Sequence, residues 1–445
     1  IITATPSKTP LIKSEYLKKG AHINAIGSDS PEKNELDKNI LKNSSLIVAD
    51  SIEQCIERGE ISHALSSGAI KKSDIYELGE ILKKNIRLNC GENENSVADL
   101  TGVAVQDIQI AKAVFKECEI EEFALERNQS LFEHKVDFNL SESGLHPLPL
   151  KEILTVEEQS TLLEKELVYG HTNGTPYLRD KISMLYDGAE RANVLATSGS
   201  AEANYIAIMT ILDPGDEIIY MTPNYLQIRG IARNIGVNVK ELPLEEDLGW
   251  QWDINKLEHL VSIKTKMIVI CHPNNPTGSI VSLKNMKNIL DIAKKNDCWI
   301  LSDEVYRGAE LDGDECPSFF GGYEKTIVNA GLSKAYRLPG LRIGWTVGPV
   351  KYIKKAWAFH DYTSISIAYH SDWVASKVLE TKRRKMILNG TKDHLNQNLE
   401  TLVKWVDTLN GKLSINKPQA GAIAFTKLNI QQSCEDLTYY LRDEY

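Results

Sequence analysis

Residues 299–306 read WILSDEVY, and this stretch decides the fold class. The run from Trp299 to Leu301 has the length and composition of a buried strand, and Asp303 and Tyr306 follow where that strand ends. Similar runs recur along the chain, separated by segments with apolar residues every three to four positions. This alternation predicts an α/β protein with a mostly parallel sheet. The runs stand at residues 217–220, 267–270 and 326–329, and the helical segments include residues 201–212 and 283–296.

Three further motifs follow or flank the predicted strands. Residues 331–344 read GLSKAYRLPGLRIG and hold Lys334 and Arg342; residues 271–278 read CHPNNPTG and hold Asn275. Residues 196–203 read ATSGSAEA and lead into a predicted helix, whose free N–H groups suit a phosphate. Taken singly, each motif has an ordinary structural interpretation. Lys334 and Arg342 would be a pair of surface cations, residues 271–278 a rigid turn, and residues 196–203 an ordinary helix start. Because ligands of open α/β sheets bind at the carboxyl ends of the strands, together they predict one site.

In this order and spacing the motifs resemble the class I/II aminotransferase superfamily of fold type I pyridoxal-phosphate enzymes. The resemblance covers about residue 138 to the end of the chain. It implies a mixed, mostly parallel seven-stranded sheet with a small α/β domain. We expect this domain at residues 121–445, with a cofactor-binding part at about 170–350. The small part is expected at about 130–168 and 351–445, with its C-terminal end truncated.

The resemblance assigns roles to the residues that would handle the cofactor's ring. Lys334 is implied to form the Schiff base and then to move the substrate Cα proton. Asp303 is implied to hold the pyridine nitrogen protonated, and Asn275 and Tyr306 to donate to the phenolate oxygen. Tyr225, in residues 221–225 (MTPNY), matches the aromatic that stacks on the ring.

The phosphate is implied to be held by a separate set of residues. Arg342 would clamp it, with further donors from Gly199, Ser200, Ala201 and Ser333. Tyr169 resembles the tyrosine that reaches the phosphate of the neighbouring subunit, which implies a homodimer.

Two positions depart from the family pattern. Gly331 stands where the family usually has Ser or Thr, so one phosphate hydroxyl is absent. After residues 418–421 (PQAG) we find no arginine to bind the substrate carboxylate, which the family carries on a further strand pair.

Two segments are similar to the branch that contains capreomycidine synthase and the pyridoxal-phosphate-dependent arginine oxidases. They are residues 139–148 (NLSESGLHPL) and 360–365 (HDYTSI). Glu142 in the first is interpreted as a partner for a cationic substrate side chain, or equally as a cap. His360 and Asp361 in the second are equally surface polar residues.

The first part of the chain carries a second set of motifs. Residues 3–6 (TATP), 21–36 (AHINAIGSDSPEKNEL) and 99–107 (DLTGVAVQD) resemble the ornithine cyclodeaminase and mu-crystallin family. The resemblance implies a partial Rossmann-like domain at residues 1–120, with Asp29 as its catalytic acid. No G-x-G-x-x-G occurs in this part, so NAD is expected only for a complete domain. The charged stretch 117–133 is the expected boundary, or equally a solvated helix face.

Composition narrows the function further. The 445 residues carry 51 Lys and Arg against 61 Asp and Glu, a net charge of −10 that argues against a nucleic-acid or anionic-membrane partner. No apolar run is long enough for a membrane helix, and no signal peptide opens the chain, so we expect a cytoplasmic protein. The seven cysteines show no metal-ligand spacing, and no metal is expected. The chain lacks an initiator Met and is interpreted as a fragment.

Three functions remain open at this stage. The first is an aminotransferase that converts a basic amino acid, such as ornithine or arginine, and a 2-oxo acid through Lys334. The second is an oxidase or cyclase of arginine derivatives that uses the same cofactor. The third is a non-catalytic regulatory module that keeps the cofactor fold. A bifunctional protein, with linked steps in its two domains, is the accompanying expectation.

Overall fold

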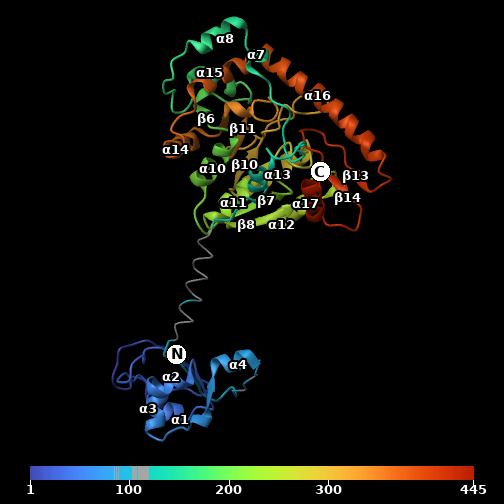
Figure 1. Ribbon diagram of the computed structural model, residues 1–445. Helices are drawn as coiled ribbons and strands as arrows, with labels where there is room; N and C mark the ends of the chain where they lie inside the picture. Colours follow the sequence, from blue (N-terminus) through green and yellow to red (C-terminus); the bar gives the residue numbers. More distant parts are fainter. Residues whose placement is uncertain (85, 87, 89, 103–107, 109–119, 445) are drawn as a thin grey trace. The chain divides into compact units, whose positions relative to one another are not determined.

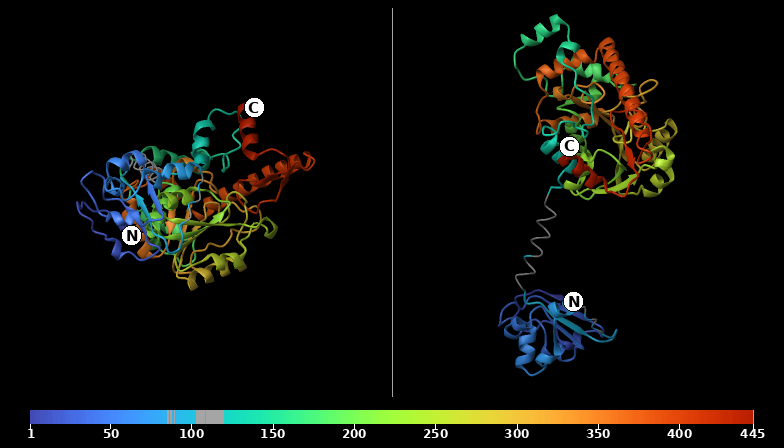
Figure 2. Two further views of the ribbon diagram at one scale, coloured as in Figure 1. Left: turned by 90° about the horizontal axis from the view of Figure 1, so that it is seen from below. Right: turned by 45° about the vertical axis from the view of Figure 1, so that its right-hand side comes forward.

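The computed structural model describes residues 1–84, 86, 88, 90–102, 108 and 120–444. Residues 103–107 of the first domain's motif, and Glu117 and Glu119 of the charged stretch, lie outside them. The chain divides into two compact units, Ile1–Glu119 and Ile120–Tyr445 (Figures 1 and 2), each described by itself below. How the second unit divides into large and small parts stays a prediction.

A parallel sheet forms the centre of the first unit. Its strand order is β1-β2-β5-β3-β4, and each neighbouring pair runs parallel. Its apolar side chains pack with the helices into one core that includes Ile23, Ile47 and Val97. This confirms the predicted Rossmann-like block. The strands are β1 (Ile2–Thr3), β2 (His22–Ala25), β3 (Leu46–Ala49), β4 (Ile75–Glu77) and β5 (Ser96–Asp99); the helices are α1 (Lys38–Lys42), α2 (Ile52–Glu57), α3 (Glu60–Ser66) and α4 (Leu78–Lys84).

A seven-stranded sheet forms the centre of the second unit, in the order β6-β12-β11-β10-β9-β7-β8. Only β12 runs antiparallel to its described neighbours, β11 and β6. This mixed, mostly parallel sheet confirms the predicted fold. The strands are β6 (Val194–Thr197), β7 (Glu217–Thr222), β8 (Asn238–Pro243), β9 (Thr265–Cys271), β10 (Trp299–Asp303), β11 (Thr326–Gly331) and β12 (Gly344–Val347); β13 (Leu413–Ile415) and β14 (Thr426–Leu428) form a separate antiparallel pair.

The sheet lies between two layers of helices because its buried strands are apolar on both faces. Ile218 and Tyr220 of β7 pack into one core cluster, and Ile219 and Met221 pack into the other. The first cluster includes α10 (Ser200–Ile211), α11 (Gln227–Asn234) and α14 (Val350–His360). The second includes α9 (Pro176–Ser183), α12 (Ile254–Leu260), α13 (Leu283–Lys295), α15 (Tyr369–Val378) and α16 (Thr381–Asp407), the long helix in Figure 1.

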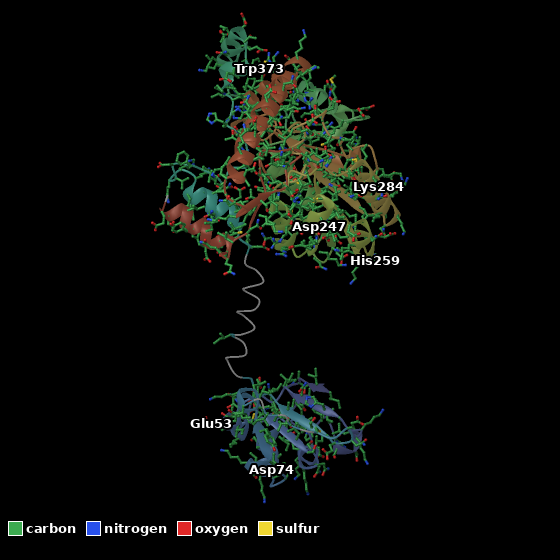
Figure 3. The ribbon with its side chains drawn as sticks, turned by 90° about the vertical axis from the view of Figure 1, so that its right-hand side faces the viewer. Glu53, Asp74, Asp247, His259, Lys284 and Trp373 are labelled. Carbon is green, nitrogen blue, oxygen red and sulfur yellow. The ribbon has the colours of Figure 1, made fainter. Side chains whose placement is uncertain are left out.

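The remaining helices are α6 (Ala124–Phe132), α7 (Leu150–Ile153), α8 (Val156–Leu163) and α17 (Cys434–Glu444). The polar faces of both units are exposed. Lys284 and His259 of the second unit and Glu53 and Asp74 of the first extend from the surface (Figure 3). No helix among the described residues has the length and apolar character of a membrane span.

The core of the second unit can be tested with a matched pair of isoleucines. Ile268 in β9 is 0% exposed, whereas Ile263 in the preceding loop is fully exposed. We expect Ile268→Ala to lower the free energy of unfolding by about 2–5 kcal/mol, and Ile263→Ala to change it by about 0.5 kcal/mol or less.

Tryptophan fluorescence during urea unfolding measures this for the second unit alone, because all seven tryptophans lie between residues 250 and 405. Equal effects of the two substitutions would contradict the layer assignment.

Candidate active site

The carboxyl ends of β9, β10 and β11 open into a cavity of about 760 Å³. Asp303 ends β10, and its register partners are Cys271, the last residue of β9, and Asn329 of β11. The loops after these strands therefore lie together. Ten of the residues predicted for the site line this cavity: Glu142, Ser200, Ala201, Tyr225, Asn275, Asp303, Tyr306, Ser333, Lys334 and Arg342.

Asp303 is a buried carboxylate, only 6% exposed. Burial raises its pKa above the ordinary value, although Asn204 Nδ2 donates to its Oδ2 at 3.0 Å and the Val305 N–H donates to its Oδ1 at 3.2 Å. Asn204 is held in turn by Asn329 Nδ2, which donates to Asn204 Oδ1 at 2.8 Å. Sequence reasoning missed Asn204, whose signal is a single amide within the apolar α10.

The Tyr306 hydroxyl is hydrogen-bonded to two other parts of the site, the Asn275 side chain and the backbone of Ser143. Asn275 Nδ2 donates to this hydroxyl at 3.4 Å, and the hydroxyl donates to the carbonyl oxygen of Ser143 at 3.1 Å. Tyr306 is 2% exposed, and burial raises its pKa, so the hydroxyl keeps its proton at neutral pH. The site therefore has a neutral donor beside the Asn275 amide.

The Lys334 ammonium reaches the loop that carries Glu142. Its Nζ donates to Ser143 Oγ at 2.7 Å and to Glu142 Oε1 at 3.1 Å. Both acceptors come from the segment that joins α6 to α7, far from Lys334 in the sequence. The structure thus brings the predicted nucleophile and the predicted substrate residue into direct contact.

A cradle for an anion lies where β6 meets α10. Gly199 has φ +86°, and a Cβ at this position would lie 2.5 Å from Arg342 Nη2, so only glycine allows the guanidinium this close. The first N–H groups of α10, from Ser200 and Ala201, have no acceptor within the helix. Together with Arg342 they form a positively polarised seat.

The glycine at position 331 has a structural reason. A Cβ there would lie 2.9 Å from the carbonyl oxygen of Ile343, so the approach of β12 leaves no room for the usual Ser or Thr side chain. The missing hydroxyl is therefore a consequence of close strand packing beside the cradle.

Glu202 fixes the start of α10 to the loop after α14. It accepts from the Ser198 N–H at 2.6 Å and from Ser364 Oγ at 3.1 Å, and it bonds the Thr363 hydroxyl. His360 Nε2 lies 3.5 Å from Glu202 and is fully buried, so the interpretation of His360 as a surface residue is wrong. Asp361 is exposed.

Tyr225 lines the cavity and contacts α6. Its hydroxyl donates to Glu126 Oε1 at 2.5 Å, and the Phe123 ring packs edge-on against it at 5.1 Å. Phe123 and Glu126 belong to the stretch interpreted as a domain boundary. Sequence reasoning gave neither of them a place in the site.

Two predicted site residues lie elsewhere. Tyr169 is 89% exposed and does not line the cavity. Asp29 belongs to the first unit, in the loop after β2, where its carboxylate accepts from Lys33 Nζ at 2.5 Å; this bond lowers its pKa. The loop is anchored by the buried Glu60, which accepts the Ser28 hydroxyl and the Glu35 N–H.

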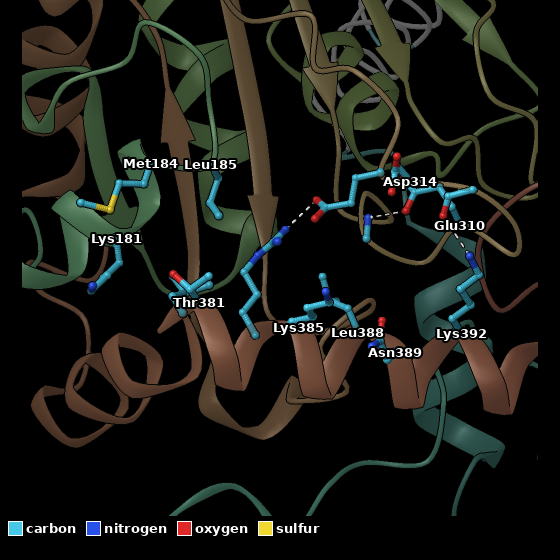
Figure 4. A pocket seen from close by; sticks show the side chains of 15 residues that line it. Lys181, Met184, Leu185, Glu310, Asp314, Thr381, Lys385, Leu388, Asn389 and Lys392 are labelled. Carbon is cyan, nitrogen blue, oxygen red and sulfur yellow. Dashed lines mark hydrogen bonds and ion pairs between the residues drawn. The ribbon is translucent and has the colours of Figure 1, made fainter.

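A second cavity, of about 400 Å³, lies between α16 and residues 308–315 (Figure 4). Arg384 of α16 donates from Nη2 to Glu315 at 2.6 Å and from Nε to the Tyr336 hydroxyl at 2.9 Å. Burial raises the pKa of Glu315, but the Arg384 guanidinium outweighs it and holds that pKa below its ordinary value. Tyr336 follows Lys334 by two residues. The hydrogen bond from Arg384 to Tyr336 therefore helps to hold the segment that carries Lys334 in place.

The comparison with known families agrees with this geometry. The family model for aminotransferase class I and II matches residues 135–445. The chain belongs to this family. By class it is a pyridoxal-phosphate-dependent transaminase. The model for the ornithine cyclodeaminase/mu-crystallin family matches residues 1–122.

Relatives in the aminotransferase family are similar over most of the second unit. Capreomycidine synthase of Streptomyces vinaceus is 26% identical over 313 residues, 69% of this chain and 79% of that protein. Aspartate aminotransferase of Pyrococcus horikoshii is 28% identical over 267 residues, 59% of this chain and 68% of that protein. A pyridoxal-phosphate-dependent aminotransferase from Streptococcus suis has a TM-score of 0.69 and 30% identity, covering 73% of this chain and 87% of that one.

The Glu202 cluster predicts a pH-dependent stability. Burial alone would raise the pKa of Glu202, but hydrogen bonds from His360, Thr363 and Ser198 outweigh it and lower that pKa to about 2. Its stabilising effect is therefore complete above the unfolded-state value of 4.5 and is lost as the pH falls toward 2.

We expect Glu202→Gln to lower the free energy of unfolding at pH 7 by about 2 kcal/mol after solvent screening. The difference in the free energy of unfolding between the variant and the unsubstituted protein should become smaller below about pH 4.5, which is the pKa of this carboxyl group in the unfolded state. Urea unfolding by tryptophan fluorescence at several pH values measures it. Glu400→Gln, at an exposed position of α16, is the matched control, with little change expected. A difference that stays constant with pH would mean that Glu202 acts by packing alone.

Proposed function

We propose that the second unit is an aminotransferase of basic amino acids in which Lys334 is the covalent attachment point for pyridoxal phosphate. The observation that carries this proposal is one cavity lined by Lys334, Asp303 and Arg342. It holds an amine, a buried carboxylate and a guanidinium beside a helix N-terminus.

The described residues fit this cofactor. Asp303 is a buried carboxylate whose pKa is raised by burial, so a protonated pyridine nitrogen would stabilise its charge. The Gly199 turn, the start of α10 and Arg342 suit the phosphate. When bound, pyridoxal phosphate supplies a carbonyl that exchanges its oxygen for the amino nitrogen of the substrate and a ring that withdraws electrons from Cα.

The residues of the chain divide the remaining work. Lys334 Nζ, which lies in the cavity, would take the proton from the substrate Cα and deliver it to the cofactor carbon that bears the exchanged nitrogen. Asn275 and Tyr306 donate to the phenolate oxygen and so set the orientation of the ring. Tyr225 covers one face of the ring, and Ser333, Ser200 and Ala201 add donors for the phosphate.

Glu142 supports the choice of a basic substrate. Its carboxylate pairs with Lys334 at 3.1 Å, and it loses that cation when the lysine becomes bonded to the cofactor. The amine or guanidine of an ornithine or arginine side chain would replace the lost charge. The similarity to capreomycidine synthase, and the two segments shared with its branch, favour an oxidase or cyclase as the second candidate.

The remaining parts of the proposal concern assembly and the first unit. We place Tyr169, 89% exposed, at the phosphate of a second copy in a homodimer, and the enzyme in the cytoplasm. Asp29 is proposed as the acid of a cyclodeaminase-like reaction. Because residues 1–119 hold no G-x-G-x-x-G, NAD binding is proposed only for a first domain that carries that segment.

Reconstitution with pyridoxal phosphate tests the attachment. We expect an absorbance band near the visible edge that shifts when ornithine is added, and that is absent in Lys334→Ala. Lys284→Ala, an exposed lysine on α13, is the matched control and should keep the band. A band that survives in Lys334→Ala would overturn the assignment.

The reaction type follows from a second experiment. A transaminase given ornithine or arginine without a 2-oxo acid should stop after one half-reaction, and a 2-oxo acid should restart it. Oxygen uptake with continued turnover in the absence of the 2-oxo acid would instead establish the oxidase.

A further inference from the structure

We propose that Glu126, on the helix α6, is a second specificity-determining residue, which binds the cationic end of the substrate side chain together with Glu142. This inference rests on the proposed function and assigns a role to a residue outside the sequence motifs. Its basis is the position of α6 over the cavity and the charge balance of the cavity wall.

The segment before α6 is fixed to the cofactor-binding unit at Glu121. The Glu121 N–H donates to Asn234 Oδ1 at 2.7 Å, and its carboxylate pairs with Arg229 and Arg233 at 3.5 and 3.4 Å. Both arginines lie on α11, which begins two residues after Tyr225. At its other end, Gln129 of α6 donates to the Ser141 carbonyl at 2.6 Å. These bonds hold α6 in its place in the cavity wall.

Glu126 itself faces Tyr225. The Tyr225 hydroxyl donates to Glu126 Oε1 at 2.5 Å, and the Phe123 ring lies against the same tyrosine. A tyrosine hydroxyl is a neutral donor, so it orients the carboxylate without neutralising it. Within the described residues no ion pair to Glu126 is found.

The charges of the described cavity wall leave a deficit of cations once the cofactor is bound. Its carboxylates are Glu126, Glu133, Glu142 and Asp303, and its cations are Lys334 and Arg342. The cofactor would engage three of these six groups, because Asp303 would hold its ring nitrogen, Arg342 would hold its phosphate and Lys334 would bond to its carbonyl carbon. Three glutamates then remain without one of these cations opposite them.

Glu126 differs from the other two glutamates of this set. Glu133 lies 3.2 Å from His134, and Glu142 lies beside Lys334 and so close to the reacting atoms. Glu126 lines the same cavity as Lys334 and lies beside Tyr225, away from the Lys334–Glu142 contact. An ammonium or guanidinium there would donate a charge-assisted hydrogen bond to the Glu126 carboxylate.

Ornithine and norvaline form a matched pair of ligands, since they differ only by the side-chain amino group. We would titrate each into the full-length holoenzyme and measure apparent affinity from the change in cofactor absorbance. Glu126→Gln should weaken ornithine binding about tenfold or more and leave norvaline within about twofold, because a charge-assisted hydrogen bond is lost. Glu122→Gln, a neighbouring carboxylate outside the cavity wall, should change neither.

Tyr225→Phe separates charge from positioning. It removes the hydroxyl but keeps the Glu126 carboxylate, so the preference for ornithine over norvaline should persist even if both affinities fall. Equal losses for both ligands in Glu126→Gln would overturn the inference, because Glu126 would then act only through Tyr225. A holoenzyme that binds norvaline as tightly as ornithine would also overturn it, while the aminotransferase proposal would stand. No absorbance response to any amino acid would defeat the proposed function itself.

Discussion

The parallel register of β9, β10 and β11 is the constraint on which the rest of this structure depends. Asp303 is opposite Cys271 on one side and Asn329 on the other, so β9 and β10 end at one level and β11 continues only to Gly331. Because parallel strands need crossover helices, the loops that follow them all emerge at the same edge. Side chains that are far apart in the sequence therefore reach one cavity without any long flexible segment.

The reversed strand β12 supplies the other half of the site. It returns between β11 and β6, and its first residue, Gly344, would place a Cβ only 2.3 Å from the N atom of Ser200. This close approach brings Arg342 to the Gly199 turn, and it also excludes a side chain at Gly331. The anion cradle and the loss of one family hydroxyl thus have the same physical cause.

The sequence was sufficient to predict the sheet and ten of the residues that line the cavity, because buried strands and the turns after them have local signatures. It was insufficient for Asn204, whose role depends on a carboxylate from a different strand. The sequence also does not distinguish Glu202 and His360 from an ordinary pair of surface residues, because their burial results from the packing of α14 against α10. Glu126 was missed for the same reason: its stretch reads as a charged boundary, and only tertiary contacts bring it to Tyr225.

The site separates rigid from adaptable parts. Groups suited to the cofactor lie on strand ends and on α10, where backbone hydrogen bonds and two packed helix layers fix them. Groups proposed to bind the substrate, Glu142 and Glu126, lie on the segment between α6 and α7 and on α6 itself, which are held by side-chain contacts. Such a segment can change between relatives without disturbing the sheet. The cofactor residues alone therefore do not determine the substrate. Members of one family can share the residues that suit the cofactor and still differ in the substrates they bind, because the residues on and after α6 can differ.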